Sequence, residues 1–461
     1  MPVVPRTLAL LITTSAALAL SPVMGASAAT ISAPDGLRAK PAPATAARHH
    51  APSKVRARAA QATATDPRAI EQWPLQGDSP MGIDTAWRQT TGADVTVAII
   101  DSGIDLGHPD LAPNLWTNPG EIPGNGIDDD GNGYVDDVHG YDFVDRDGTP
   151  QDANGHGTHV AGIVGARGGN GVGGSGVAWH VRLMAVRVLD ANAQGTTAGV
   201  AQGIRYAVDN GARVVNLSLA GPSSTPDLEA AVQYAQARGV LIVAAAGNDG
   251  ADLTTSPTYP AAYGEDNVLG VAATTRDGGL SSVSDYGPGA DVAAPGEQVL
   301  STALGGGYEY RTGTSMAAPE VTGALVLLAA ARPDLSGNGL RDALLAGVRH
   351  GGLPVSAGAL DIGAALRTVI PASAWKSAPV DALSSYTSNA LGTSASAKAK
   401  AKAKQAAAKK KATAKKKAAA KKPLSKKAKA LAKARAKAKA KAKRAAAARA
   451  KARRAAAAKR G

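Results

Sequence analysis

The sequence predicts an α/β domain of three layers, in which helices cover both faces of a mostly parallel β-sheet, with extensions at both ends. Three observations support this prediction. Short apolar, β-branched runs alternate along the chain with segments of helical periodicity. The runs are apolar throughout, which is typical of strands buried on both faces. The length of 461 residues suits one large α/β domain plus extensions.

The expected elements follow one another in a simple order. We expect buried strands at 95–100, 181–189, 214–219, 240–246 and 268–273, and helices at 198–210, 228–238 and 316–331. In a parallel sheet of this type, functional side chains gather at the carboxyl ends of the strands.

The first 29 residues have the pattern of a signal peptide. Arg6 supplies positive charge, the 13 residues at 8–20 are apolar and uncharged, and small residues at 26–28 match a cleavage site. A membrane anchor is the alternative, but a span needs about 20 apolar residues. We therefore expect a secreted, extracellular protein without a stable membrane span.

The rest of the chain divides by composition. Residues 30–66 lack periodicity and are expected to be a disordered extension or a short pro-segment, 67–370 form the globular domain, and 371–397 are a Pro-, Ser- and Ala-rich linker. Residues 398–461 are almost entirely Ala, Lys and Arg.

The net charge of +14 hides two parts of opposite sign. Residues 398–461 contain 28 Lys and Arg and no acidic residue, so the remainder holds 51 − 28 = 23 basic residues against 37 acidic ones, a net charge of −14. There is no cysteine, which excludes disulfides as a source of stability. Bound calcium is the usual alternative in an exported protein.

Three segments have the residues needed for nucleophilic catalysis. Asp101 ends a buried strand, His156 opens a helix of small residues, and Ser315 stands at a helix start with Thr314 as the expected N-cap. A serine hydroxyl needs a base to remove its proton, a histidine can be that base, and a buried carboxylate orients the imidazole. The order Asp, His, Ser is the one found in subtilisin.

These segments resemble the subtilisin-like (subtilase) peptidases over roughly residues 68–370. The resemblance implies the subtilisin-like fold and a serine endopeptidase acting on polypeptides, with Asp101, His156 and Ser315 as its triad and no cofactor for catalysis. It also implies that Asn248, after a buried strand, donates a hydrogen bond to the oxyanion. We expect a monomer.

The same resemblance implies a peptide groove. Ser218, Leu219, Ala220 and Gly247 match the positions that line the primary specificity pocket and pair with the substrate backbone. The family usually has glycine where this chain has Ala220, which puts the side-chain preference in doubt. Glu320 is a second departure, because the family often has histidine there.

An acidic loop predicts a calcium site. Oxygen ligands at Asp128, Asp130 and Asn132 and the carbonyl of Tyr134 match the first half of an EF-hand-type loop. His139 stands where the bidentate glutamate is expected, so Asp136 or Asp137 would complete the sphere. The alternative is an acidic surface loop without metal, but its crowded aspartates repel one another unless a cation is bound. Similarity to the family implies a second calcium site with Asp110 and Asn170 as ligands.

The basic segment suggests a second role. Lysines without acidic partners repel one another, which favours a disordered tail in water. It resembles the Lys/Ala-rich tails of some bacterial histone-like proteins, and it predicts binding to an anionic polymer, in the cell wall or as extracellular nucleic acid. The alternative is an extension that only makes the protein more soluble. The competing view of the whole chain is a polyanion-binding surface protein with a secondary or inactive protease fold.

Overall fold

The computed structural model describes residues 29–33, 66–77 and 79–376. The predicted signal peptide, most of the N-terminal extension, most of the linker and the whole basic tail lie outside these described residues.

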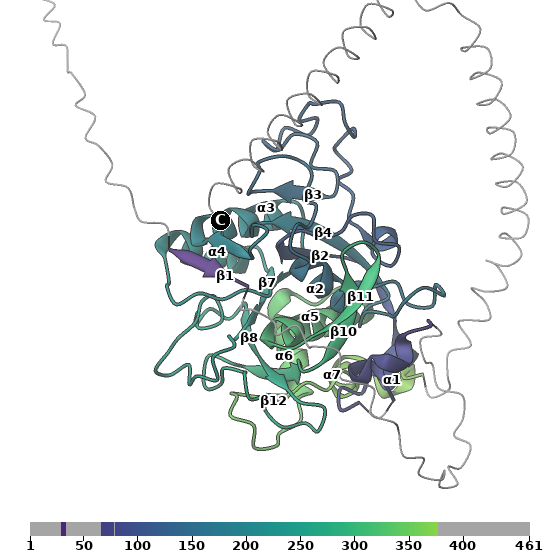
Figure 1. Cartoon of the computed structure of the whole chain (residues 1–461). Coiled ribbons are helices and arrows are strands. Elements are labelled where there is room, and N and C mark those ends of the chain that lie inside the picture. Colours follow the sequence, from purple (N-terminus) through teal and green to yellow (C-terminus); the bar gives the residue numbers. More distant parts are fainter. Residues whose placement is uncertain (1–28, 34–65, 78, 377–461) are drawn as a thin grey trace, which may run out of the picture. The chain divides into compact units, whose positions relative to one another are not determined.

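The domain contains twelve strands and seven α-helices within the described part (Figure 1). The strands are β1 (Thr30–Ser32), β2 (Gly92–Asp101), β3 (Gly140–Asp142), β4 (His180–Arg187), β5 (Gln194–Thr196), β6 (Val214–Leu217), β7 (Leu241–Ala245), β8 (Val268–Thr274), β9 (Val292–Pro295), β10 (Val299–Ala303), β11 (Gly307–Arg311) and β12 (Gly358–Ala359). The helices are α1 (Ile83–Gln89), α2 (His156–Gly165), α3 (Thr197–Asp209), α4 (Pro226–Ala237), α5 (Thr314–Ala331), α6 (Gly337–Ala346) and α7 (Ile362–Val369).

The main sheet has eight strands in the order β12-β9-β8-β7-β6-β2-β4-β3. Every pairing within it is parallel. The remaining strands form two antiparallel pairs, β10 with β11 and β1 with β5. The prediction of a mostly parallel sheet is confirmed.

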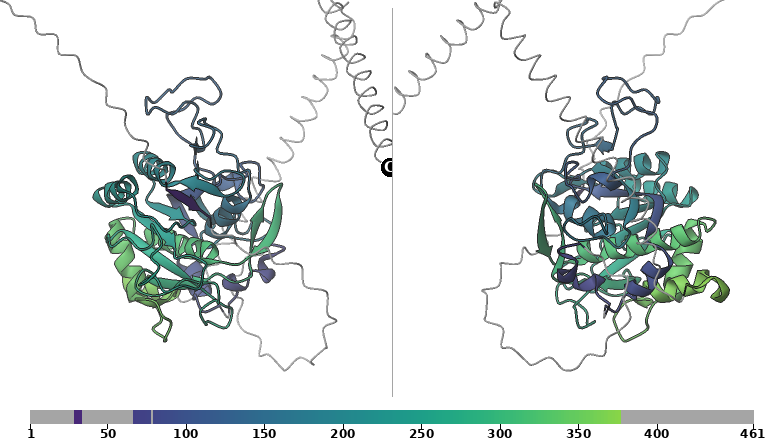
Figure 2. Two further views of the ribbon diagram at one scale, coloured as in Figure 1. Left: turned by 60° about the vertical axis from the view of Figure 1, so that its left-hand side comes forward. Right: turned by 90° about the vertical axis from the view of Figure 1, so that its right-hand side faces the viewer.

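Successive residues of β2 face opposite layers of the domain. Val97 and Ile99 belong to one buried cluster, with residues of α2 and α5, whereas Ala98 and Ile100 belong to another, with residues of α3 and α4. This alternation is the two-residue period of a strand covered on both sides. The views in Figure 2 show the teal helices α3 and α4 and the green helices α5 to α7 on different sides of the sheet.

The five predicted strands and three predicted helices all form, with ends shifted by a few residues. The short strands β3, β9 and β12 and the helices α1, α6 and α7 were not predicted. Strands of two to four residues give too few positions for a periodic signal.

Two segments beside the predicted domain boundaries contact the domain. Thr30–Ser32, expected to be disordered, forms β1, because its backbone pairs with β5. At the other end, the first residues of the predicted linker pack on the domain, since Lys376 exchanges hydrogen bonds with the side chain of Gln89 at 3.0 Å.

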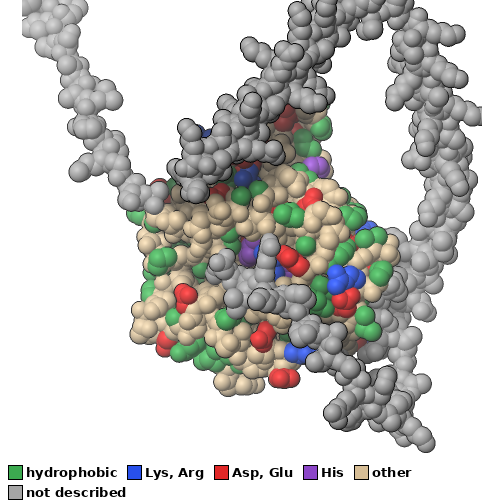
Figure 3. All heavy atoms as spheres, in the orientation of Figure 1, with side chains coloured by type: hydrophobic (Ala, Val, Ile, Leu, Met, Phe, Trp, Pro, Cys, Tyr) green, Lys and Arg blue, Asp and Glu red, His purple; other side chains and the backbone are tan. Residues whose placement is uncertain are grey.

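The core helix α5 is long and apolar enough to cross a membrane by length and composition. However, 89% of it is buried inside the domain, as expected for the central helix of a packed layer. Figure 3 shows one face of the molecule. Where described residues form this face, acidic, basic and apolar side chains are interspersed.

Candidate active site

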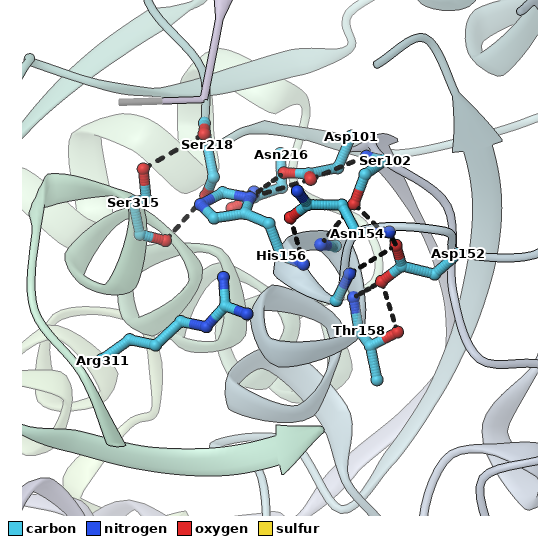
Figure 4. A network of polar contacts seen from close by, with 12 residues as sticks. Asp101, Ser102, Asp152, Asn154, His156, Thr158, Asn216, Ser218, Arg311 and Ser315 are labelled. Atoms are coloured by element: carbon cyan, nitrogen blue, oxygen red, sulfur yellow. Dashed lines mark hydrogen bonds and ion pairs between the residues drawn. The ribbon is translucent and has the colours of Figure 1, made fainter. Parts of the chain in front are cut away.

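Asp101 is the last residue of β2 and is fully buried. Its Oδ1 atom accepts a hydrogen bond of 2.7 Å from the backbone N–H of Ser102. The same carboxylate faces His156, whose Nδ1 lies 2.8 Å from Oδ1 and 3.0 Å from Oδ2 (Figure 4). The pairing assigns the proton to Nδ1, because an ionised carboxylate can only accept.

His156 is held at the start of α2 by a close helix–strand contact. A Cβ atom at Gly157 would lie 2.2 Å from the carbonyl oxygen of Gly103 and 3.1 Å from the Cβ of Asp101, both closer than van der Waals contact, so only glycine lets α2 approach β2. His156 Nε2 is buried and has no hydrogen-bond partner in the structure. It is therefore available as a base.

The carboxylate of Asp152 fixes the loop before His156, and the sequence analysis missed it. Its Oδ1 accepts from the N–H groups of Asn154 and Gly155 and from the hydroxyl of Ser102, and its Oδ2 accepts from the N–H and hydroxyl of Thr158. Asp152 thereby satisfies unpaired donors at the start of α2. An aspartate four residues before a helical histidine is the signal that could have indicated it.

A second histidine in the same motif is not a candidate base. His159 lies one turn further along α2, and burial lowers its pKa to about 3, with the nearby charge of Arg311 adding to the effect. Its Nε2 lies 3.0 Å from the carbonyl of Glu309. His159 is therefore a neutral core residue near neutral pH.

Ser315 is the second residue of α5 and is fully buried. Its Oγ donates a 3.1 Å hydrogen bond to the carbonyl of Ser218, and the hydroxyl of Ser218 donates in turn to the carbonyl of Ser315 at 2.8 Å. In Figure 4, Ser315 and His156 lie next to each other, and both are close to Ser218. A rotation about the Ser315 side chain is needed to bring Oγ to Nε2, and apo enzymes often show such loose contacts.

The start of α5 corrects one prediction. Thr314 is not the N-cap; Gly313 is, with φ of 152°, a conformation that side chains disfavour. Asn248 replaces the expected cap, because its Oδ1 accepts hydrogen bonds from the N–H of Thr314 at 2.8 Å and from its hydroxyl at 2.9 Å.

This contact fixes the orientation of the Asn248 amide. A backbone N–H can only donate, so the atom facing Thr314 must be oxygen and Nδ2 must point the other way. Nδ2 is buried and has no partner in the structure. The N–H of Ser315, in the first turn of α5, also has no acceptor within the helix. Two donors are thus directed at the space beside Ser315.

The predicted groove residues lie on two segments beside Ser315. Ser218, Leu219 and Ala220 follow β6, and Gly247 follows β7, with its N–H donating to the hydroxyl oxygen of Thr314 at 3.2 Å. Leu219 is fully buried, whereas Ala220 is half-buried. The backbone N–H and C=O of Ala220 pair with Ser32 of β1, at 3.0 and 3.2 Å. This edge therefore has backbone groups that pair with an extended strand, here β1 of the chain itself.

In the acidic loop, side-chain oxygens of several residues lie close together. Carboxylate oxygens of Asp128, Asp130 and Glu121 lie within 4.8 Å of one another, an all-oxygen set of the kind that calcium prefers. The sequence analysis missed Glu121, because it lies outside the loop motif. Asn132 lies beside Asp130 through a 3.2 Å hydrogen bond, and its Oδ1 accepts from the N–H of Tyr134.

The two candidates for completing that set behave differently. Asp136 accepts hydrogen bonds from the N–H groups of residues 124–126, which directs its carboxylate to a neighbouring turn. Asp137 is fully buried and contacts Asn132 at 3.2 Å and the hydroxyl of Tyr206 at 2.6 Å. Asp137 thus contacts a residue of the acidic loop, whereas the carboxylate of Asp136 is engaged by residues 124–126.

Asp110 and Asn170, the predicted ligands of a second calcium site, are in contact. Asn170 Nδ2 donates to Asp110 Oδ1 at 2.6 Å. Burial raises the pKa of Asp110, and the charge of Asp66 raises it further. Asp66, another buried carboxylate, accepts from the N–H groups of Gly169 and Gly171 on the same loop. Its position at the end of the predicted extension hid it from the sequence analysis.

Known proteins are similar to this chain over its globular domain. Residues 92–359, more than half of the chain, match the family model described as the Subtilase family. The chain is 44% identical over 247 residues to a thermophilic serine proteinase from Bacillus sp. (strain AK1), covering 53% of this chain and 55% of that protein. Thermitase from Thermoactinomyces vulgaris is 44% identical over 244 residues, covering 53% and 78%. Subtilisin BL from Lederbergia lenta is 42% identical over 257 residues, covering 56% and 84%.

Solved structures show the same likeness. A protease from Pseudoalteromonas arctica PAMC 21717 aligns with a TM-score of 0.57 at 30% identity, covering 66% of this chain and 99% of that chain. A cold-adapted subtilisin-like serine proteinase aligns with a TM-score of 0.50 at 32% identity, covering 64% and 93%.

Proposed function

The chain belongs to the subtilase family of serine peptidases, and on that premise we propose that it hydrolyses internal peptide bonds of polypeptides with Ser315, His156 and Asp101. We base this on one observation above all: a buried imidazole has its Nδ1 bound to Asp101 while its Nε2 is free beside a helix-start serine.

The geometry supports a two-step acyl transfer. The Oγ of Ser315 attacks the carbonyl carbon of the scissile bond while His156 Nε2 takes its proton. The tetrahedral oxyanion then accepts hydrogen bonds from Asn248 Nδ2 and the N–H of Ser315. His156 gives its proton to the departing amine as the C–N bond breaks. Water next attacks the acyl-enzyme with His156 as base, which releases the acid product and restores Ser315.

The direct test is Ser315→Ala. We expect hydrolysis of an unstructured protein such as casein to fall by roughly 10⁶-fold, the scale of loss when a triad serine is removed. The melting temperature should change little, and a serine-directed phosphonylating reagent should label the parent at Ser315 only. Full activity in the variant, or labelling elsewhere, would contradict the triad.

We further propose that calcium stabilises the domain at two places. Asp128, Asp130 and Glu121, with the loop oxygens of Asn132 and Tyr134 and the neighbouring Asp137, would hold one ion. Asp110 and Asp66, with the side chain of Asn170, would hold another. Each group offers hard oxygen ligands in a chain without disulfides, and a cation would offset the repulsion between carboxylates.

Export and tethering complete the proposal. The pattern of residues 1–29 favours secretion, and the charge of residues 398–461 favours attachment of the secreted enzyme to an anionic polymer, such as one in the cell wall. A polyanion-binding protein with an inactive protease fold is disfavoured, because His156 is paired with Asp101 and Asn248 caps the helix that carries Ser315.

A further inference from the structure

Asp285 lies against the loop that carries Asn248. This aspartate belongs to the segment between β8 and β9 and is fully buried. Its Oδ1 accepts hydrogen bonds from the N–H of Asp249 at 2.9 Å and from the N–H of Ala251 at 2.8 Å. The backbone N–H of Asp285 donates to the carbonyl of Gly247 at 3.0 Å. Asn248 is therefore held through its neighbours on both sides.

The glycine before Asn248 leaves room for this carboxyl group. Gly247 has a φ of 119°, a conformation that side chains disfavour, and a Cβ atom there would lie 2.0 Å from Asp285 Oδ2. The loop can pass over the carboxyl group only because residue 247 is glycine. The N–H of Gly250 also donates to the carbonyl of Val283 at 3.0 Å, which joins the same two segments. The turn that presents Asn248 is thus built around Asp285.

The two oxygens of Asp285 differ in their surroundings. Oδ1 has the two loop N–H groups, whereas Oδ2 is buried without a hydrogen-bond partner among the described residues. A buried polar atom without a partner destabilises a fold, so only the contacts of Oδ1 explain a carboxyl group here. Burial raises the pKa of Asp285, and the N–H groups of Ala251 and Asp249 oppose that rise. An amide oxygen in the same place would accept the same two hydrogen bonds.

The contact with the loop reaches the reaction through Asn248. Asn248 Oδ1 is bound to Thr314 at the start of α5, so the position of the loop backbone sets the direction of Nδ2. No hydrogen bond joins Asp285 to the triad within the part of the chain that the structure describes. Any effect of Asp285 on the rate therefore acts by placing another group, and a displacement of about 1 Å can cost about 10²-fold in rate.

We propose that Asp285 is a positioning residue of the oxyanion hole: it fixes the turn that carries Asn248 and thereby directs the Asn248 amide at the oxyanion. This inference rests on the peptidase function proposed above. The role needs the acceptor at Oδ1 and not a negative charge. Asparagine should therefore replace Asp285, and alanine should not.

The kinetic test compares Asp285→Ala with Asp285→Asn in the full-length protein, using a small chromogenic peptide. Asp285→Ala should lower kcat by about 10- to 10²-fold, with a KM within about twofold of the parent, because stabilisation of the transition state is lost and substrate binding is not. Asp285→Asn should keep kcat within about threefold of the parent, since its oxygen can still accept. Asp252→Ala is the matched control. Asp252 accepts from the N–H of Thr254 at 2.8 Å, so its loss should leave kcat unchanged.

A double-mutant cycle separates positioning from general damage to the fold. In an Asn248→Ala background the amide is absent, so its position cannot affect the rate. Adding Asp285→Ala there should change kcat by about twofold or less, because the two residues act through one contact. If the two losses instead add in full, Asp285 acts on the rate by another route and the inference is overturned.

Hydrogen exchange in a Ser315→Ala background gives a readout that does not need activity. Asp285→Ala should speed exchange of the amides of Asp249 and Ala251, which otherwise donate to Asp285, and Asp285→Asn should protect them as the parent does. An Asp285→Asn protein that protects both amides but loses kcat would overturn the inference, even if Asp285→Ala does not fold.

The two proposals fail in different ways. If the exchange difference appears but the parent hydrolyses no peptide, the contact of Asp285 with the loop stands and the proposed function fails. If the parent hydrolyses peptide and Asp285→Ala has the same kcat, the positioning role fails and the proposed function stands.

Discussion

Glu320 is a carboxyl group buried in the middle of α5, with 1% of its surface exposed. Its Oε2 atom has no hydrogen-bond partner, and burial raises its pKa well above the usual value of 4.5. Below pH 4.5 the carboxyl is protonated in both the folded and the unfolded protein. Above pH 4.5 the carboxyl is still protonated in the folded protein but releases its proton on unfolding. The stability contributed by the neutral carboxyl is therefore lost as the pH rises toward the folded-state pKa.

The variant Glu320→Gln should therefore become more stable than its parent as the pH rises from 5 to 9. Melting temperatures in a Ser315→Ala background, which prevents autolysis, measure this difference, and each 1 kcal/mol corresponds to about 2 °C in a domain of this size. The exposed Glu229→Gln is the control, with a difference that should stay constant. A constant difference for Glu320→Gln would show that the buried carboxyl does not govern the pH dependence.

Asn248 presents the two ends of its amide to different surroundings. Its Oδ1 caps α5 through Thr314, while its Nδ2 is free to stabilise the oxyanion. We expect Asn248→Asp, which keeps the acceptor and removes the donor, to lower kcat about 10²- to 10³-fold, the range measured for such a donor in subtilisin. Its melting temperature should stay near that of the parent, whereas Asn248→Ala should lose rate and stability together. An Asp variant with full kcat would remove Asn248 from the oxyanion hole.

The side chains of the proposed triad could be identified from the sequence, but the residues that support them could not. Asp101, His156 and Ser315 stand in motifs whose residue types follow from the chemistry. The roles of Asp152 and Glu121 depend on loops that approach only in the folded chain, since each accepts N–H groups whose positions no linear pattern reveals. The capping of α5 by a residue 66 positions away is unpredictable for the same reason.

At the scale of elements, the calcium sites proposed above predict that the stability of the domain depends on the metal. Chelation after verified metal removal should lower the melting temperature and speed autolysis. A ligand that binds only the folded state stabilises it by about 3 kcal/mol at a hundredfold excess over Kd. Asp130→Asn should reduce the effect of added calcium, while Asp277→Asn, an exposed aspartate outside both clusters, should not. An unchanged melting curve in chelator would refute the role of calcium.

The strands that were easiest to predict from the sequence are those buried on both faces of the sheet. Strands β2, β6 and β7 run through the centre of the sheet, so their buried residues are mostly apolar and easily recognised. Strand β1 has one buried side chain among its three residues, and it forms only because β5 and Ala220 supply partners for its backbone. Such a strand carries no periodic signal of its own.

At the scale of the whole molecule, the uneven distribution of charge was evident from the sequence alone. The part of the chain before residue 398 has a net charge of −14, and 398–461 carry +28. The fold of the described domain gives no reason for that difference, because its stability and its triad involve only residues before 377. The two parts can therefore be tested separately.

We expect residues 398–461 to tether the enzyme to polyanions by charge alone. They contain no aromatic residue to stack on bases, so sequence-specific recognition of a nucleic acid is not expected. Binding should come from counterion release and fall steeply as the salt concentration rises. The acidic remainder should be repelled by the same surface, so protein ending at Lys376 should not be retained.

Retention on heparin, DNA or a purified anionic wall polymer across a salt series measures this tether. The full-length and truncated proteins should cleave a small peptide at the same rate, because the triad lies within the domain, and should differ only in retention. Replacing the lysines of 398–417 with glutamine should lower the slope of log Kd against log salt concentration. That slope is proportional to the number of phosphate or carboxylate groups that the lysines neutralise. Equal retention of the two proteins, or retention indifferent to salt, would mean that the basic segment is a solubilising extension rather than a tether.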